Sequence, residues 1–261
     1  MVALPPIWYE EARRLWTVAS GTARSRLECQ SIDTTDPDEI AGALSWDYQQ
    51  AHSPTDRFRS YYPDDFQLPE PFSGDPTHAS VVVIGQNPGY DFAETIPRFK
   101  TEFEAYIRFY TERFVAAERL EEMPAKVTSG VRKQIAHYAR IEKAVPPVKL
   151  GMTAVYVDAV PWKMDGPSLK RLETAWKNVG SPVNSRLQRL IAAAPSHRVT
   201  LVLGQLTARW CGLQEPSEQE PIVEITRAFR DRPALAILHP RRYTIPPQTQ
   251  ERLLAMLRGS S

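Results

Sequence analysis

Four short apolar runs, rich in β-branched residues, stand out along the chain. They span residues 80–84, 154–157, 199–203 and 234–238. Each run is nearly continuous in apolar character rather than alternating, which is typical of strands buried on both faces of a parallel sheet. Because helix-compatible segments separate the runs, the pattern predicts a three-layer α/β/α domain with a central four-stranded parallel sheet.

The segments between and after these strands have helical periodicity. Their boundaries follow from prolines and glycines, which end or interrupt helices. We predict a long helical region over 98–143, two helices within 168–194 divided at 180–182, a short helix at 205–212 and a closing helix at 246–258.

The first 78 residues differ in composition from the rest. Residues 8–19 and 37–50 have helical patterns, whereas 51–76 is rich in proline, aspartate, serine and aromatic residues. This stretch is too apolar for a free linker, so we expect it to cover the sheet. We therefore predict a helical and irregular N-terminal extension over 1–78, packed on an α/β domain at 79–261.

Composition and charge exclude several classes of protein for this chain. The chain has 261 residues, 42% hydrophobic and 24% charged, with a formal net charge of +1. A net charge so close to zero excludes a general polycation, so any contact with DNA must come from a local basic patch. No apolar run approaches the ~20 residues that a membrane span needs, and the start lacks a signal-peptide core. The two cysteines and the spacing of the histidines suggest neither a zinc site nor another metal site. We expect both cysteines to be reduced thiols in a cytoplasmic protein. We also expect no cofactor, no membrane contact and no obligate protein partner.

Polar residues follow three of the four predicted strands. The first strand leads into GQNPG at 85–89, the second is followed by Asp158, and the fourth is followed by His239. In parallel sheets the carboxyl ends of the strands form the usual site of chemistry. The less specific interpretations are an ordinary turn at 85–89, a capping role for Asp158 and a structural role for His239.

Basic residues near these loops also have two interpretations. Arg241 and Arg242 would belong to a solvated turn or contact phosphate groups. Lys163, Lys170 and Arg171 would form a solvated face, with phosphate contact as the alternative.

The combination of GQNPG after the first strand and HP-R after the last resembles the uracil-DNA glycosylase superfamily, particularly its single-strand-selective and mismatch-specific branches. The resemblance extends to VYVDAVPWK, which looks like the base-reading segment, and to VLGQLTA. It covers the chain from about residue 80 onwards and implies a glycosylase-like fold with DNA as partner.

The resemblance also implies roles for individual residues. Asn87 would position the attacking water, and His239 would donate a hydrogen bond to O2 of the departing base. The base would contact Phe99 by stacking and the backbone of Gln86 along the pocket. The DNA contacts would come from Arg241, Arg242 and Tyr243, with Arg242 or Tyr243 filling the vacated stack.

Two departures from the uracil-specific pattern concern the choice of base. Asp158 stands where uracil-excising members have asparagine; an ionised carboxylate only accepts hydrogen bonds and would favour the amino group of cytosine. If protonated by desolvation, it would instead donate to cytosine N3, or serve uracil. Gly89 stands where strict uracil enzymes have a bulky aromatic residue, so a 5-substituent would fit. The chain is thus similar to a phage-defence branch that removes glucosylated hydroxymethylcytosine.

Other functions compete with base release from modified cytosine. Excision of uracil or another deaminated base in base-excision repair is the strongest competitor. A catalytically silent DNA- or nucleotide-binding module would use the same pocket, although it would need neither Asn87 nor His239. An enzyme acting on free nucleotides is a further alternative. A lysine nucleophile is disfavoured because neither main loop contains lysine.

Overall fold

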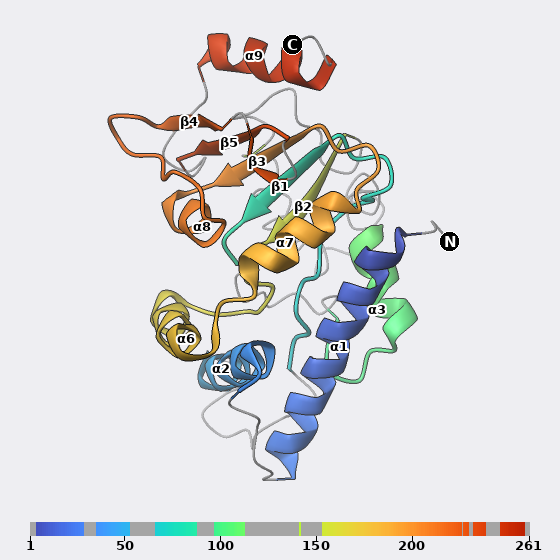
Figure 1. Cartoon of the computed structure of the whole chain (residues 1–261). Coiled ribbons are helices and arrows are strands. Elements are labelled where there is room, and N and C mark those ends of the chain that lie inside the picture. Colours follow the sequence, from blue (N-terminus) through green and yellow to red (C-terminus); the bar gives the residue numbers. More distant parts are fainter. Residues whose placement is uncertain are drawn as a thin grey trace, which may run out of the picture.

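A five-stranded sheet forms the centre of the computed structural model, with the strand order β2-β1-β3-β5-β4 (Figure 1). The structure describes residues 4–28, 35–52, 66–87, 97–112, 141, 153–225, 227–229, 232–238 and 246–258. The strands are β1 (Val81–Gly85), β2 (Ala154–Asp158), β3 (Val199–Leu203), β4 (Ile222–Ile225) and β5 (Ala234–Ile237). The α/β class is confirmed, as are strands at the four predicted places.

The prediction of four parallel strands is wrong in one respect, because β4 adds a fifth strand. It pairs antiparallel with β5 at the edge of the sheet, while the pairs β1–β2, β1–β3 and β3–β5 are parallel. Only Val223 of β4 is buried. A half-exposed edge strand lacks the continuous apolar run by which strands were predicted.

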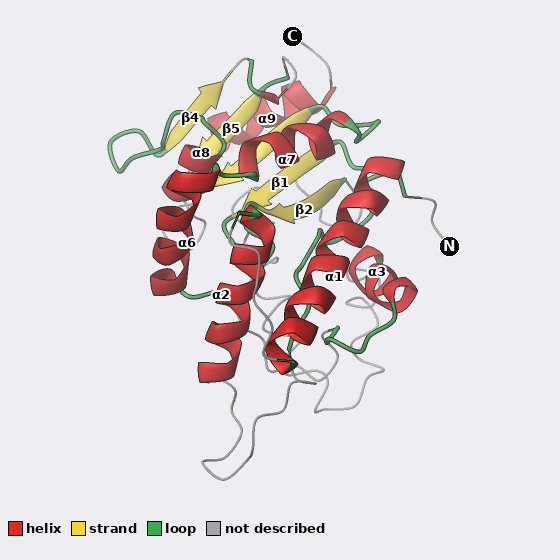
Figure 2. Cartoon of the chain, turned by 60° about the horizontal axis from the view of Figure 1, so that its bottom comes forward, coloured by secondary structure: helices red, strands yellow, loops and turns green. Residues whose placement is uncertain are grey.

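Helices lie on both sides of the sheet. Figures 1 and 2 show α7 in front of the sheet and α9 on the opposite side. None of the described helices is long and apolar enough to cross a membrane. The helix bounds are α1 (Pro6–Leu27), α2 (Pro37–His52), α3 (Phe103–Thr111), α6 (Gly166–Val179), α7 (Val183–Ala192), α8 (Gln205–Trp210) and α9 (Pro247–Arg258).

The division between α6 and α7 is confirmed at the predicted place. The side chain of Asp165 accepts a hydrogen bond of 2.8 Å from the backbone N–H of Ser168 and so caps the start of α6. Gly180 ends α6 with φ 89°, a conformation that favours glycine. Pro182 then precedes α7.

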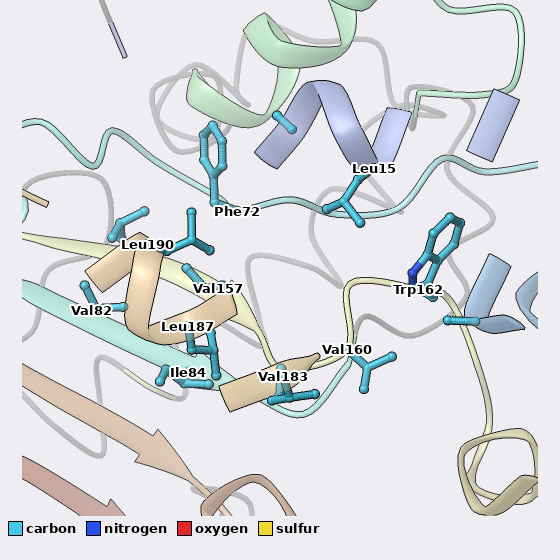
Figure 3. Packing of buried hydrophobic residues seen from close by; sticks show 14 of the residues in the cluster. Leu15, Phe72, Val82, Ile84, Val157, Val160, Trp162, Val183, Leu187 and Leu190 are labelled. Atoms are coloured by element: carbon cyan, nitrogen blue, oxygen red, sulfur yellow. The ribbon is translucent and has the colours of Figure 1, made fainter. Parts of the chain in front are cut away.

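The apolar side chains of the sheet pack into two layers, one on each face. On one face, Figure 3 shows Leu187 and Leu190 of α7 against the strands. Their partners include Val82, Ile84, Val157 and Val202. On the other face, Val83, Tyr156, Leu201, Leu235 and Ile237 pack with Ile141. Burial on both faces explains the continuous apolar runs of the inner strands.

The N-terminal helices lie on the α7 side of the sheet. α1 packs against α2, α3 and α7, and α2 packs against α6 (Figure 2). Phe66 and Phe72 are buried in the same core, and Ser73 pairs antiparallel with Tyr156 of β2. The expected cover of the sheet by this stretch is thus seen over 66–76, whereas Phe58, Tyr61 and Tyr62 lie outside the described residues, as does most of 113–152.

Two helical glycines, Gly21 of α1 and Gly42 of α2, differ in the space around them. Gly42 faces the Trp162 ring of the β2–α6 connection. A Cβ on Gly42 would lie 2.8 Å from Thr22 Oγ1 and 3.2 Å from the Trp162 ring, whereas a Cβ on Gly21 would meet nothing within 4 Å. We expect Gly21→Ala to stabilise the protein by about 0.5–1 kcal/mol. Gly42→Ala should destabilise it by about 1 kcal/mol or more, because overpacking outweighs the helix preference. Urea unfolding measures both; equal stabilisation by both substitutions would contradict this packing.

Candidate active site

The carboxyl ends of four strands meet at one edge of the sheet, facing α2, α6 and α8 (Figure 1). Gly85 of β1 lies in register beside Asp158 of β2, and Asn87 follows Gly85 by two positions. On the other side of β1, Leu203 of β3 pairs with Ile237 of β5. The chain leaving β5 towards residue 239 therefore starts at the same edge, two strand spacings or roughly 10 Å from β1.

Asp158 is buried at this edge, in a space that Gly85 leaves open. Its Oδ1 accepts a hydrogen bond of 3.1 Å from the hydroxyl of Tyr156, and its exposed fraction is 1%. A Cβ on Gly85 would overlap the Tyr156 hydroxyl and lie 2.7 Å from Asp158 Oδ1. The glycine is thus required for the close approach of β1 to this pair, and Tyr156 fixes the plane of the carboxyl group.

The Asn87 side chain is held by the loop after β2. Its Nδ2 donates a hydrogen bond of 2.8 Å to the backbone carbonyl of Met164. Only the amino group of the amide can donate to a carbonyl, so this contact determines which way round the amide lies. The Oδ1 atom, which accepts hydrogen bonds, is directed away from Met164.

The loop at 158–164 is itself held by backbone hydrogen bonds to its neighbours. Ala159 N–H and Val160 N–H donate to the carbonyls of Gly85 and Gln86, each at 2.9 Å. The Pro161 carbonyl accepts from Glu70 N–H at 2.8 Å. The Lys163 carbonyl accepts from the Ser45 hydroxyl of α2 at 2.9 Å. These bonds continue the β1–β2 pairing past the strand ends and tie the loop to the N-terminal segments.

Arg186 of α7 lies in the core beneath the start of this loop and binds its first two carbonyl groups. Its Nη2 donates to the carbonyls of Asp158 and Ala159, both at 2.6 Å. Only 6% of Arg186 is exposed, and burial lowers the pKa of its guanidinium from the usual value. Because a buried cation is costly without partners, both carbonyls and a nearby carboxylate are needed to keep it there.

The nearby carboxylate comes from α1. Glu11 Oε1 lies 3.8 Å from Arg186 Nε and 2.7 Å from Arg14 Nη2, and Arg14 also pairs with Asp38 of α2. Burial lowers the pKa of Arg14, but the two carboxylates outweigh it and raise that pKa above its usual value. The N-terminal helices thus supply the counter-charges for the cation that holds the Asp158 loop.

Lys163 does not lie on a solvated face, and that prediction is wrong. Its side chain is 2% exposed, and its Nζ lies 3.7 Å from Glu70 Oε2, whose side chain is equally buried. Glu70 Oε1 in turn accepts a 2.7 Å hydrogen bond from Ser73. A partner from a distant segment explains how a lysine can be buried. Lys170 and Arg171, in contrast, are exposed as expected.

The structure brings some of the predicted site residues together. Asn87, Gln86 and Asp158 lie side by side through the β1–β2 contacts given above. Phe99 is half-buried, packs against the core and donates its backbone N–H to Phe66 at 2.8 Å, so its stacking on a base stays a prediction. Gly89, His239, Arg241, Arg242 and Tyr243 lie outside the described residues.

Sequence reasoning missed Tyr156 and Arg186. Tyr156 precedes Asp158 by two positions in a strand, so alternation alone places both side chains on one face. Arg186 lies within the apolar face of α7 that includes Val183, Leu187 and Leu190. A charged residue inside an apolar stripe signals a buried cation with partners. Nothing in the sequence near Arg186 indicates that Glu11 is the partner.

Other reactive groups do not offer an alternative centre within the described part of the chain. No group of three or more His, Cys, Asp or Glu side chains there is placed to hold a metal ion. Cys211 is buried, and burial raises the pKa of its thiol to about 12. A thiol with such a pKa is not a nucleophile at neutral pH.

Comparison with known proteins adds no family assignment: no protein-family model matches the chain, and no curated protein matches it.

Substitution of Arg186 tests whether it holds the Asp158 loop. Arg186→Gln removes the cation between Glu11 and two carbonyls, which should cost about 3 kcal/mol of unfolding free energy. It should also accelerate hydrogen exchange at Ala159 and Val160 more than in β3, because their bonds to β1 lose support. The matched control is Arg189→Gln, an exposed arginine of the same helix, which should change stability by less than about 0.5 kcal/mol. Uniform acceleration across β2 and β3 would contradict a local role.

Proposed function

We propose that the protein is a monofunctional DNA N-glycosylase that hydrolyses the base–sugar bond of a flipped pyrimidine. The observation that carries the proposal is the pairing of an oriented amide, Asn87, with a buried carboxyl group, Asp158, at adjoining strand ends. An amide and a carboxyl group at adjoining strand ends suit water orientation and base reading, respectively.

The proposed reaction needs little from the protein besides positioning. The bond between C1′ and the base nitrogen breaks with its electron pair leaving on the base, and the sugar becomes oxocarbenium-like. Water forms the new bond to C1′ and loses a proton, and the base leaves protonated, so an abasic sugar remains. Asn87 Oδ1 accepts a hydrogen bond from this water, without acting as a strong base. His239 stabilises the charge on the base O2, which is largest in the transition state.

The proposed target is a 5-modified cytosine. A carboxylate at position 158 accepts from an exocyclic amino group and repels the O4 of uracil. The Tyr156 hydroxyl bonded to Oδ1 supports this role because it fixes the carboxyl group in one orientation. Gly89 would leave room for a hydroxymethyl or glucosylated substituent, as occurs in bacteriophage DNA. On this proposal the protein acts in antiviral defence.

The proposed DNA contacts lie in the segment after β5. Arg241 and Arg242 would contact phosphate groups, and Arg242 or Tyr243 would fill the space left by the flipped base. With a net charge of +1, the chain depends on such a local basic group to bind DNA.

Mass spectrometry of released bases tests the proposed function. The protein would be incubated with DNA containing uracil, cytosine, hydroxymethylcytosine or glucosylated hydroxymethylcytosine. We expect release of a 5-modified cytosine and an intact strand with an abasic site. Asn87→Ala should slow release by about a hundredfold, since the water is no longer oriented. Asp158→Asn should shift preference towards uracil, because the amide donates to O4.

The control variant is Asn178→Ala, which removes an exposed asparagine of α6 and should leave the rate unchanged. Release of uracil alone would contradict the proposed specificity and indicate base-excision repair. DNA binding without release of any base would contradict catalysis and indicate a binding module. A preference for free nucleotides over DNA would indicate a nucleotide-directed enzyme.

A further inference from the structure

A polar pocket lies at the opposite edge of the sheet, between the amino ends of the central strands. It is open to solvent, and its volume is about 590 Å³. Ser80 directly precedes β1, Arg198 directly precedes β3, and Arg232 lies two positions before β5. The remaining lining comes from His78, Pro195, Ser196 and His197. The segments that lead into three neighbouring strands, β1, β3 and β5, therefore meet at this pocket.

The lining of this pocket is basic. It contains two arginines and two histidines and no acidic residue. Among the described residues, no carboxylate lies within ion-pair distance of Arg232, in contrast to Arg14 or Arg209. Apart from Pro195, every lining residue has a polar side chain. The pocket therefore suits a small anion better than an apolar ligand.

The backbone positions the basic residues. Arg198 N–H donates to the Ser80 carbonyl at 2.8 Å, and the Pro233 carbonyl accepts from Thr200 N–H at 3.1 Å. These bonds join the ends of β1, β3 and β5 and so fix where Arg198 and Arg232 leave the sheet. Both arginines therefore leave the same edge of the sheet from backbone that the strand pairing holds in place.

His197 is a buried residue of the pocket lining, and the charge of Arg232 acts on it. The residue is 1% exposed, and one ring nitrogen, Nε2, lies 2.9 Å from the Thr200 hydroxyl. Burial, together with the positive charge of Arg232, lowers the pKa of His197 to about 4. The imidazole is therefore neutral at pH 7, and the pocket charge there comes from the arginines.

We propose that this pocket binds a phosphate group, held chiefly by the guanidinium group of Arg232, with Arg198 and His78 lining the same pocket. A guanidinium offers paired N–H donors that match two oxygens of a phosphate. The phosphate belongs either to a free phosphorylated compound or to a DNA backbone, which offer the same group. The inference does not depend on the proposed glycosylase activity, because the pocket lies at the other edge of the sheet.

Titration with inorganic phosphate tests the pocket. The imidazole signals of His78 and His197 would be followed by NMR, at constant ionic strength, and assigned with His78→Gln. We expect a saturable shift of both signals and a rise in the pKa of His197, since a bound anion favours its protonated form. Arg232→Gln should weaken phosphate binding about tenfold. Arg24→Gln, which removes an exposed arginine of α1, should not change it.

The source of the phosphate is distinguished by adding a single-stranded oligonucleotide. Competition with inorganic phosphate, weakened by Arg232→Gln, would identify a DNA backbone as ligand; no competition would identify a free phosphorylated compound. The absence of a saturable shift, or equal binding by wild type and Arg232→Gln, would overturn the proposal. Because Arg232 lies far from Asn87, base release by Arg232→Gln reports on the glycosylase proposal separately.

Discussion

The candidate site depends on one buried cation, Arg186. Its guanidinium donates to the carbonyls of Asp158 and Ala159, at the point where β2 leaves the sheet. Carbonyls at strand ends have lost their partners in the sheet, and burying them without donors is costly. Arg186 meets that need, and its own charge is balanced by Glu11. This interaction stabilises the direction in which the chain leaves β2, whereas Asp158 itself is placed by its register with Gly85.

The same interaction explains what the N-terminal helices contribute. α1 carries Glu11, and α2 carries Ser45, which donates to the Lys163 carbonyl. Between them these elements hold the 158–164 loop, and the far end of that loop binds the Asn87 amide through Met164. The first 78 residues are therefore not a separate cap: part of them shapes the edge at which Asn87 and Asp158 lie.

The sequence was informative where a local pattern reflects a local cause. Continuous apolar runs predicted the inner strands, and parallel pairing then placed Asn87 and Asp158 at one edge. The strand β4 was not predicted because a half-exposed edge strand has no continuous apolar run. Lys163 was misplaced because its partner, Glu70, lies on a distant segment that only folding brings near. The Arg186 contacts were missed for the same reason, since charge pairing across the core leaves no periodic signal.

The central claim is that Asn87, Asp158 and His239, two positions after β5, surround one flipped base. A crystal structure with DNA carrying a non-hydrolysable analogue of 5-hydroxymethyl-deoxycytidine tests it most directly. The account predicts the base at the carboxyl edge, with Asp158 within hydrogen-bond distance of the amino group and His239 within hydrogen-bond distance of O2. A base bound elsewhere, or His239 pointing away from Asn87, would contradict it.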